Sequence, residues 1–278
     1  MRFFRLRLFC ATLLLFLFVL LVAVRAVAAA PKKTAATAAI TLSRTRAANV
    51  NVVLVRADLS APNVRVSVAL ARGGPGSSER FSRLMQRTGA TAGLTGTFFG
   101  TDNKQPIGDI VIGGRLAHFG GRGAALCFPR SPQRGRRGRR AVMRDNAGIS
   151  RHTDWSRYQT VIAGGMWLVR NGRLALKPRA QGFRDPSLFR PAARVAVGLT
   201  GGNELLLVAT RQPVTLEGWA RTLRALGTRD ALNLDGGSST GLFYRGRVVL
   251  RPGRRLTNAL VVYENGGGRQ GPARKTAK

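Results

Sequence analysis

The stretch Ala231-Leu-Asn-Leu-Asp-Gly-Gly-Ser-Ser-Thr-Gly-Leu-Phe-Tyr-Arg-Gly246 places an aspartate, two glycines and three hydroxyl side chains directly after an apolar strand pattern. Glycine lets the backbone turn sharply and approach a ligand, so Asp235 is expected at a strand tip that a substrate can reach. Consecutive glycines also offer backbone N–H groups to an anion. The same composition fits a plain turn between two strands with a solvated aspartate, and this stretch alone leaves both interpretations open.

The chain on either side reads mainly as β-hairpins. Alternating apolar residues flank Gly-Gly or Asn-Gly pairs in Pro106–His118, Tyr158–Leu176 and Arg194–Ala209, and each pattern predicts two strands joined by a turn. Two further strands are expected at Val52–Ala57 and Val64–Leu70.

Only two helices are predicted. Phe81, Leu84 and Met85 share one face of a short helix that ends near Gly89, and Thr215 can cap a second helix that runs to Leu226. Because hairpins dominate, we predict an α+β domain with a largely antiparallel or mixed β-sheet, built from hairpins with a few helices.

Two more segments are candidates for a site. Ala90–Gly100 carries Thr-Gly-Thr in front of two phenylalanines, which fits either a binding strand or a strand that brings aromatic side chains into the core. Asp109 follows Gly108 just inside the next strand, either as a second working carboxylate or as a solvent-exposed acid. Gly164 and Gly165 fit a backbone that approaches a ligand, although a simple β-bend explains them as well.

These segments, taken in chain order, resemble the motifs of the phosphodiester glycosidase family. Asn233–Thr240 matches a family run of Leu-Asp-Gly-Gly-Gly-Ser-Ser-Thr with one glycine fewer, and Thr95–Gly100 is similar to an Asn-Gly-Gly-Phe-Phe motif. Pro106, Gly164-Gly165 and Arg194-Val-Ala-Val-Gly fall where the family has related segments. The resemblance covers roughly residues 91–263.

The resemblance has departures. Thr95 stands where the family has asparagine, Thr97 where it has glycine or a small residue, and Met166 where it has proline. A hydroxyl at position 95 changes the geometry of any hydrogen bond to substrate made there, so the resemblance does not fix the precise substrate.

The resemblance implies hydrolysis of a sugar-1-phosphodiester at the glycosidic carbon, releasing the sugar and leaving a phosphomonoester. Asp235 would stabilise the oxocarbenium-like carbon, act as nucleophile or direct water, with Asp109 as its partner carboxylate. Arg194 has a planar guanidinium that suits a phosphate, and it would bind there with the backbone amides of Gly236 and Gly237.

The predicted substrate-binding residues come from the same motifs. They are Thr95, Gly96, Thr97, Gly164, Gly165, Asn233, Gly236, Gly237, Ser238, Ser239 and Thr240. Two histidines far apart and no cysteine pair argue against a zinc site. The sequence requires no cofactor, and it leaves room for a divalent cation between Asp235 and a phosphate.

The N-terminal residues have the pattern of a targeting segment. Arginines precede the uncharged run Leu8–Val24, and small residues follow, so residues 1–28 are expected to be a signal peptide or an uncleaved signal anchor. We expect a linker at 29–50, a phosphodiester glycosidase-like domain at 51–264 and a disordered basic tail at 265–278. The protein would then be secreted or periplasmic, or held at the membrane by Leu8–Val24.

The charge is strongly basic. Lys and Arg number 46 against 12 Asp and Glu, for a net charge of +34. Such a field draws polyanions, so the expected partner is a phosphodiester-linked glycan or envelope polymer. No aromatic interleaving or recognition-helix pattern predicts specific nucleic-acid binding. The rival hypotheses are a non-catalytic binding module for anionic envelope polysaccharide and a structural envelope protein; the oligomeric state is not predicted.

Overall fold

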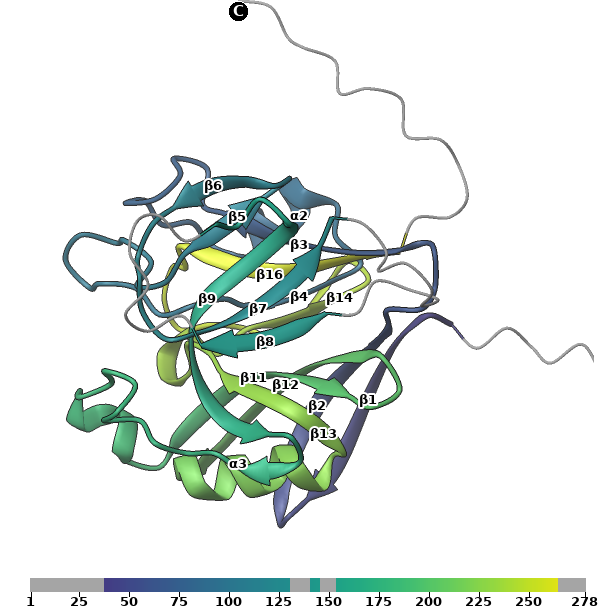
Figure 1. Ribbon diagram of the computed structural model, residues 1–278, viewed down its shortest axis with the longest axis vertical. Coiled ribbons are helices and arrows are strands. Elements are labelled where there is room, and N and C mark those ends of the chain that lie inside the picture. Colours follow the sequence, from purple (N-terminus) through teal and green to yellow (C-terminus); the bar gives the residue numbers. More distant parts are fainter. Residues whose placement is uncertain (1–37, 131–140, 146–153, 265–278) are drawn as a thin grey trace, which may run out of the picture. The chain divides into compact units, whose positions relative to one another are not determined.

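Two β-sheets pack face to face in the structure (Figure 1). The computed structural model describes residues 38–130, 141–145 and 154–264. All strand pairs within these residues are antiparallel. The fold is therefore mostly β, and the prediction of a hairpin-built antiparallel sheet is confirmed, whereas the α+β class overstated the helical content.

The larger sheet has eleven strands, with β1-β2-β12-β11-β13-β9-β5-β6 as its main order, β10 and β7 paired to β9, and β8 paired to β7. Its strands are β1 (Ile40–Ala47), β2 (Val50–Asp58), β5 (Ile110–Ile112), β6 (Arg115–His118), β7 (Ala124–Pro129), β8 (Val142–Asp145), β9 (Tyr158–Arg170), β10 (Arg173–Leu174), β11 (Ala192–Thr200), β12 (Glu204–Val214) and β13 (Thr228–Asn233).

The smaller sheet has five strands in the order β15-β14-β4-β16-β3. They are β3 (Val64–Leu70), β4 (Ala92–Thr95), β14 (Leu242–Tyr244), β15 (Arg247–Leu250) and β16 (Asn258–Glu264). Two α-helices, α2 (Phe81–Thr88) and α3 (Leu216–Ala225), and two 3₁₀ turns, η1 (Pro186–Phe189) and η2 (Gly237–Ser239), complete the described elements.

The main core lies between the two sheets. Val195 and Val197 of β11 pack in one apolar cluster with Leu94 of β4 and Leu260 of β16. Successive strand residues point to opposite faces, so Ala196 of β11 belongs instead to the outer face of the larger sheet. Both faces of the central strands are buried, which explains their nearly continuous apolar sequences.

The helices cover the outer faces of the sheets. Trp219 and Leu223 of α3 pack on the larger sheet, and Leu84 and Met85 of α2 pack on the smaller one. Thr215 caps α3 by accepting a hydrogen bond from the backbone N–H of Gly218 at 3.1 Å. Both predicted helices are confirmed, as are the hairpins β5–β6, β9–β10 and β11–β12.

The N-terminal strands differ from the prediction. β1 lies within residues 29–50, which were expected to be a linker, and all eight of its residues pair with β2. The sequence hides this strand because β1 is at the edge of the sheet, where of its eight residues only Ile40 is buried and the rest can be polar. β2 and β3 both form, yet they belong to different sheets: β2 pairs with β12, and β3 with β16.

Some predictions concern parts of the chain outside the described residues. The signal peptide or anchor, including Leu8–Val24, and the tail at 265–278 are among them, so these boundaries stay predictions. Across the portion that the structure does describe, helices are too short or too polar to cross a membrane.

Candidate functional site

Asp235 lies where the chain leaves the larger sheet and reaches the smaller one. The backbone N–H of Leu234 still donates to Val195 of β11, at 2.9 Å, whereas the N–H of Asp235 donates to the carbonyl of Gly96 after β4, at 3.1 Å. Gly236 and the turn η2 follow immediately. The predicted strand tip is confirmed, and it falls at the junction of the two sheets.

Arg254 holds the carboxylate of Asp235 in place. Its Nη2 donates to Asp235 Oδ2 at 2.9 Å, and its Nε donates to the hydroxyl of Ser239. The guanidinium carbon also lies 4.4 Å from the ring centre of Phe99, a cation–π contact. Asp235 is only 5% exposed, whereas the side chain of Arg254 is 34% exposed, so the carboxylate is shielded from water and the guanidinium is partly accessible.

Burial raises the pKa of Asp235 above its ordinary value, because a desolvated carboxylate is less stable than a solvated one. The nearby charge of Arg254 and the hydrogen bonds from Ser239 and Arg254 oppose this effect and limit the rise in pKa. A buried carboxylate beside a fixed cation is suited to stabilise positive charge that develops in a transition state.

Arg254 was not among the predicted site residues. It belongs to the Arg-rich loop 251–255, and nothing local distinguishes it from the other basic residues of the chain. Asn258 was also missed: its Oδ1 accepts from the N–H of Thr97 at 2.8 Å, and its Nδ2 donates to the carbonyl of Thr97 at 3.3 Å. The amide of Asn258 thereby fixes the backbone of the Thr-Gly-Thr segment.

The Thr-Gly-Thr segment is built into the protein interior. Thr95 Oγ1 donates to the carbonyl of Ser239 at 2.5 Å, so its hydroxyl connects β4 to the turn η2. A side chain at Gly96 would begin 1.9 Å from Asn258 Oδ1, which only glycine avoids. Thr95 therefore shapes the loop that follows Asp235 through its bonded hydroxyl, and its predicted contact with substrate stays a prediction.

Three predicted site residues carry buried polar atoms that have no hydrogen-bond partner. They are Thr97 Oγ1, Asn233 Oδ1 and Thr240 Oγ1, and among the described residues only Trp219 Nε1 shares this property. Native proteins satisfy nearly all buried polar groups, so each exception calls for a structural or functional explanation. Because these three atoms lie in the two predicted motifs, they support this region of the fold as the candidate site.

The end of the glycine run is accessible. Gly237 and Ser238 are exposed, whereas Gly236 is half-buried with its backbone against Ala193 and Arg194, and Ser239 is buried. Gly237 and Ser238 are therefore the part of the predicted phosphate-binding run that a ligand can reach.

Asp109 does not act as a partner carboxylate in this arrangement. It is fully buried, and its Oδ1 accepts from the N–H groups of Gly120 and Gly121 at 2.9 and 2.7 Å. Its Oδ2 accepts from Trp155 Nε1 at 2.9 Å. With both oxygens engaged in this way, the carboxylate organises the loop that follows β6, and its contacts do not include Asp235.

The Gly164-Gly165 pair is part of β9 and allows close packing. A side chain on Gly164 would begin 2.1 Å from Thr97 Oγ1, and Gly164 also has a φ of 86°. The Cβ of any residue at position 165 would meet Leu232 at 3.0 Å. The glycines bring β9 against the Thr-Gly-Thr segment, which is a positioning role and not direct contact with an open cleft.

Arg194 also differs from its predicted role. Its Nε donates to the carbonyl of Val214, and its Nη2 donates to the carbonyls of Leu188 and Arg190, at 2.7 to 3.1 Å. Burial lowers the pKa of Arg194 to about 10. The guanidinium ties the η1 segment to the larger sheet, so Arg254 and not Arg194 is the arginine beside Asp235.

Two hollows adjoin the contact between Arg254 and Phe99. Arg254 lines one of about 310 Å³, and Phe99 lines another of about 360 Å³. The second hollow also includes Phe98, Phe183 and Asp185. Asp185 is exposed, and hydrogen bonds from Ser187 lower its pKa. Aromatic rings and a carboxylate around a cavity are suited to a sugar ring.

No metal site is evident in the described ranges. Within residues 38–130, 141–145 and 154–264, no three His, Cys, Asp or Glu side chains come together in a way that could hold a metal ion. A divalent cation shared between Asp235 and a substrate phosphate stays a prediction.

Solved structures share this two-sheet fold. A hypothetical protein from Synechocystis superposes with a TM-score of 0.66 at 17% identity, over 82% of this chain and 63% of that one, so the chain spans less than two thirds of its length. The catalytic domain of zebrafish N-acetylglucosamine-1-phosphodiester alpha-N-acetylglucosaminidase, auto-inhibited by its pro-peptide, gives 0.65 at 19% identity, over 84% of this chain and 86% of that one. A putative exported protein from Burkholderia pseudomallei gives 0.56 at 17% identity, with 77% and 74% covered.

At these identities the structural matches establish the fold alone. No curated protein matches the sequence. The two-sheet fold is shared with a phosphodiester glycosidase-type catalytic domain. The family model described as phosphodiester glycosidase matches residues 88–263, more than half of the 278 residues, and the chain belongs to that family.

Proposed function

We propose that the protein hydrolyses a sugar-1-phosphodiester at the glycosidic carbon. The observation that carries this proposal is the fixed trio of Asp235, Arg254 and Ser239, at the motif that the family model covers. In the proposed reaction the bond between the anomeric carbon and the phosphate oxygen breaks, and the phosphate leaves with the electron pair. Water supplies the new hydroxyl of the sugar and gives up its proton.

Arg254 is suited to bind the departing phosphate. A guanidinium has five N–H donors, and the contacts with Asp235 and Ser239 use two of them. The remaining donors can meet phosphate oxygens while the ring of Phe99 and the carboxylate of Asp235 keep the guanidinium in place. The exposed residues Gly237 and Ser238 lie two and three positions after Asp235 and can add donors.

Asp235 would face the anomeric carbon. A phosphate is already a good leaving group, so stabilisation of positive charge on the sugar matters more than a strong general acid. The hollow lined by Phe98, Phe99 and Phe183 would hold the sugar ring. Thr97, Asn233 and Thr240, with their unpaired polar atoms, support this region as the binding side.

The substrate that we favour is a phosphodiester-linked envelope glycan or polymer outside the cytoplasm. A net charge of +34 would attract such a polyanion. The secretory pattern of residues 1–28 would place the protein in the periplasm or medium, or at the membrane by way of Leu8–Val24.

Release of free sugar from a panel of sugar-1-phosphodiesters tests the proposal. The full-length wild type should release sugar, whereas Asp235→Asn and Arg254→Gln should lose at least about a hundredfold in kcat/KM, as for removal of a fixed electrostatic group. Arg173→Gln serves as a control, because Arg173 is exposed on β10. No release by wild type, with or without added divalent cation, would refute the proposed hydrolysis.

A non-catalytic binding module is the second candidate. It is favoured by the engagement of Asp109 and Arg194 in internal hydrogen bonds, which leaves one buried carboxylate beside Arg254. Binding of anionic polysaccharide without turnover, retained in Asp235→Asn, would support this candidate over the hydrolase.

A further inference from the structure

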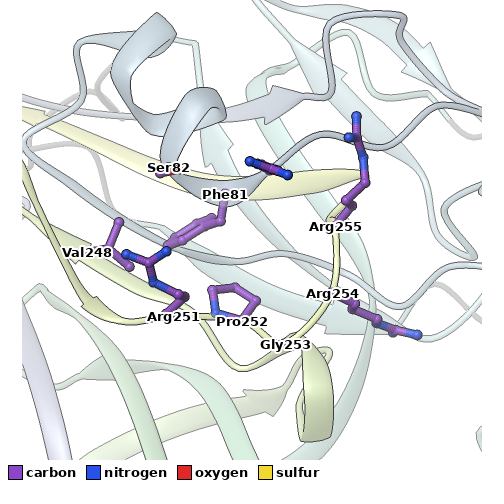
Figure 2. Close-up of a pocket in the computed structure, with 9 residues that line it drawn as sticks. Phe81, Ser82, Val248, Arg251, Pro252, Gly253, Arg254 and Arg255 are labelled. Atoms are coloured by element: carbon purple, nitrogen blue, oxygen red, sulfur yellow. The ribbon is translucent and has the colours of Figure 1, made fainter.

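A hollow of about 310 Å³ lies between the start of α2 and the loop 251–255, which connects β15 to β16 (Figure 2). Four of its nine lining residues are arginines, and none is acidic. The arginines are Arg80, Arg251, Arg254 and Arg255. Phe81, Val248 and Pro252 supply apolar wall, and the side chains of Arg80, Arg251 and Arg255 are exposed at its rim.

The four guanidinium groups differ in their partners. Arg254 is committed to Asp235 and Ser239, and Arg255 donates to the carbonyl of Ser78 at 2.7 Å. Within the described residues, Arg80 and Arg251 take part in no ion pair. Two cationic side chains at one hollow therefore have no ion-pair partner among the described residues.

The loop 251–255 holds Arg251 and Arg254 in different surroundings. Figure 2 shows Arg251 beside Phe81, and Arg254 extending from the other side of Pro252 and Gly253. Gly253 is held by its N–H, which donates to the carbonyl of Ser238 in η2 at 2.8 Å. One short loop thus carries the arginine that contacts Asp235 and the arginine that faces the hollow.

Like charges that share a hollow repel one another, and an oxyanion between them reverses that repulsion. Guanidinium groups bind phosphate through charge-assisted hydrogen bonds, which are about twice as strong as neutral ones. Ser82 adds a hydroxyl to the wall. Phosphate-type oxyanions therefore match the chemistry of this hollow better than a neutral sugar does.

We propose that this hollow binds a second phosphate of the substrate, next to the phosphate held by Arg254. This inference rests on the proposed function, because Arg254 belongs both to the Asp235 pair and to the wall of the hollow. It narrows the substrate class to oligomers or polymers in which sugars are joined by successive phosphodiesters. A single phosphodiester fills the position beside Asp235 and leaves Arg80 and Arg251 without a ligand.

Kinetics on two substrates test the inference. On a sugar-phosphate oligomer, the Arg80→Gln/Arg251→Gln variant should lose on the order of tenfold in kcat/KM, which corresponds to one charge-assisted contact. On a sugar-1-phosphodiester whose second ester group is a single methyl, its kcat/KM should stay near that of wild type. A control variant, Arg173→Gln/Arg224→Gln, removes the same charge from exposed positions on β10 and α3. An equal loss of kcat/KM on both substrates, or no loss on the oligomer, would overturn the inference and leave the proposed hydrolysis in place.

A binding measurement separates failure of the inference from failure of the proposed function. Calorimetry with tripolyphosphate at physiological salt should show binding to wild type and to the control variant, and on the order of tenfold weaker binding to Arg80→Gln/Arg251→Gln. Equal weakening in both variants would assign the binding to overall charge and overturn the inference. Selective weakening in a protein that hydrolyses no phosphodiester would support the oxyanion site and refute the hydrolysis.

Discussion

Arg254 lies with its guanidinium carbon 4.4 Å from the ring centre of Phe99, which follows the Thr-Gly-Thr segment. The contact joins the two halves of the candidate site, since Arg254 comes from the loop before β16 and Phe99 from the segment after β4. The aromatic ring limits the positions of the guanidinium, so its hydrogen bonds to Asp235 and Ser239 have a defined direction.

Lysine is expected to replace Arg254 poorly. The ammonium group is compact and lacks the planar fork, and bonds to Asp235 and Ser239 would leave it one N–H donor for a phosphate, against three on the guanidinium. We expect Arg254→Lys to reduce kcat/KM on a hydrolysed sugar-1-phosphodiester by about a hundredfold, with little change in the free energy of unfolding. Arg173→Lys is the control for charge-conserving replacement of an exposed arginine. Full activity in Arg254→Lys would remove Arg254 from the phosphate site.

The raised pKa of Asp235 makes stability depend on pH. The folded protein holds this proton more tightly than the unfolded chain does, so the stabilising contribution is full below the unfolded pKa and is lost as pH rises through the folded pKa. The free energy of unfolding of wild type, relative to Asp235→Asn, should therefore fall from pH values below about 3.9 toward neutrality, by about 1.4 kcal/mol for each unit of pKa increase.

Urea denaturation of both proteins across that range measures the difference. The Asp235→Asn variant has no titrating carboxyl at this position, so loss of the ion pair with Arg254 changes its free energy of unfolding by an amount that does not follow the titration of Asp235. The readout is therefore how the difference in free energy of unfolding between the two proteins changes with pH. A difference that rises with pH would show that Arg254 outweighs burial and lowers the pKa of Asp235.

Asp109 should be important for stability. Alanine at this position leaves three donors without their acceptor, the N–H groups of Gly120 and Gly121 and the indole N–H of Trp155. We expect Asp109→Ala to lower the free energy of unfolding by about 2 kcal/mol or more, since a buried unpaired group such as the indole N–H of Trp155 costs about 1–3 kcal/mol and the half-buried N–H groups of Gly120 and Gly121 add to that cost. Asp102→Ala removes an exposed acid and should change it by less than about 0.5 kcal/mol. Similar effects of both changes would contradict the role assigned to Asp109.

Gly164 and Thr97 should be energetically coupled. A Cβ at position 164 would begin 2.1 Å from Thr97 Oγ1, and the φ of 86° adds strain for any other residue. We expect Gly164→Ala to cost about 3 kcal/mol, and Thr97→Ala to recover at least about 1 kcal/mol of that loss in the double variant. A double-mutant cycle by equilibrium denaturation measures the coupling. Strictly additive effects would show that backbone strain alone accounts for the cost.

The sequence predicted the elements that depend on local patterns. The apolar run ending at Asp235, the cap at Thr215 and the turn at Gly113-Gly114 are each specified by neighbouring residues, and each is found in the structure. β1 was missed because an edge strand buries little, so Ile40–Ala47 has no apolar alternation that would distinguish it from a linker.

The partners of the site residues could not be predicted in the same way. Arg254 lies 19 positions from Asp235, in a chain with 46 basic residues, and only the meeting of the two sheets brings its guanidinium to the carboxylate. Asp109 and Arg194 were expected to face a ligand because they begin strands in matching motifs. Asp109 instead accepts a hydrogen bond from the indole of Trp155, which is distant in sequence. Arg194 donates to the carbonyl of Leu188, which belongs to an irregular segment with no periodic pattern.

The passage of the chain from the larger to the smaller sheet at Asp235 has a consequence for folding. The carboxylate follows β13, whereas Arg254 precedes β16, so their pairing requires that both sheets have formed and docked. An intermediate with only one sheet in place would lack the charged pair, however native its strands were. Ligand binding at Asp235 and Arg254 would therefore favour the fully docked state over partly folded forms, and a ligand would raise the resistance of the whole sandwich to unfolding.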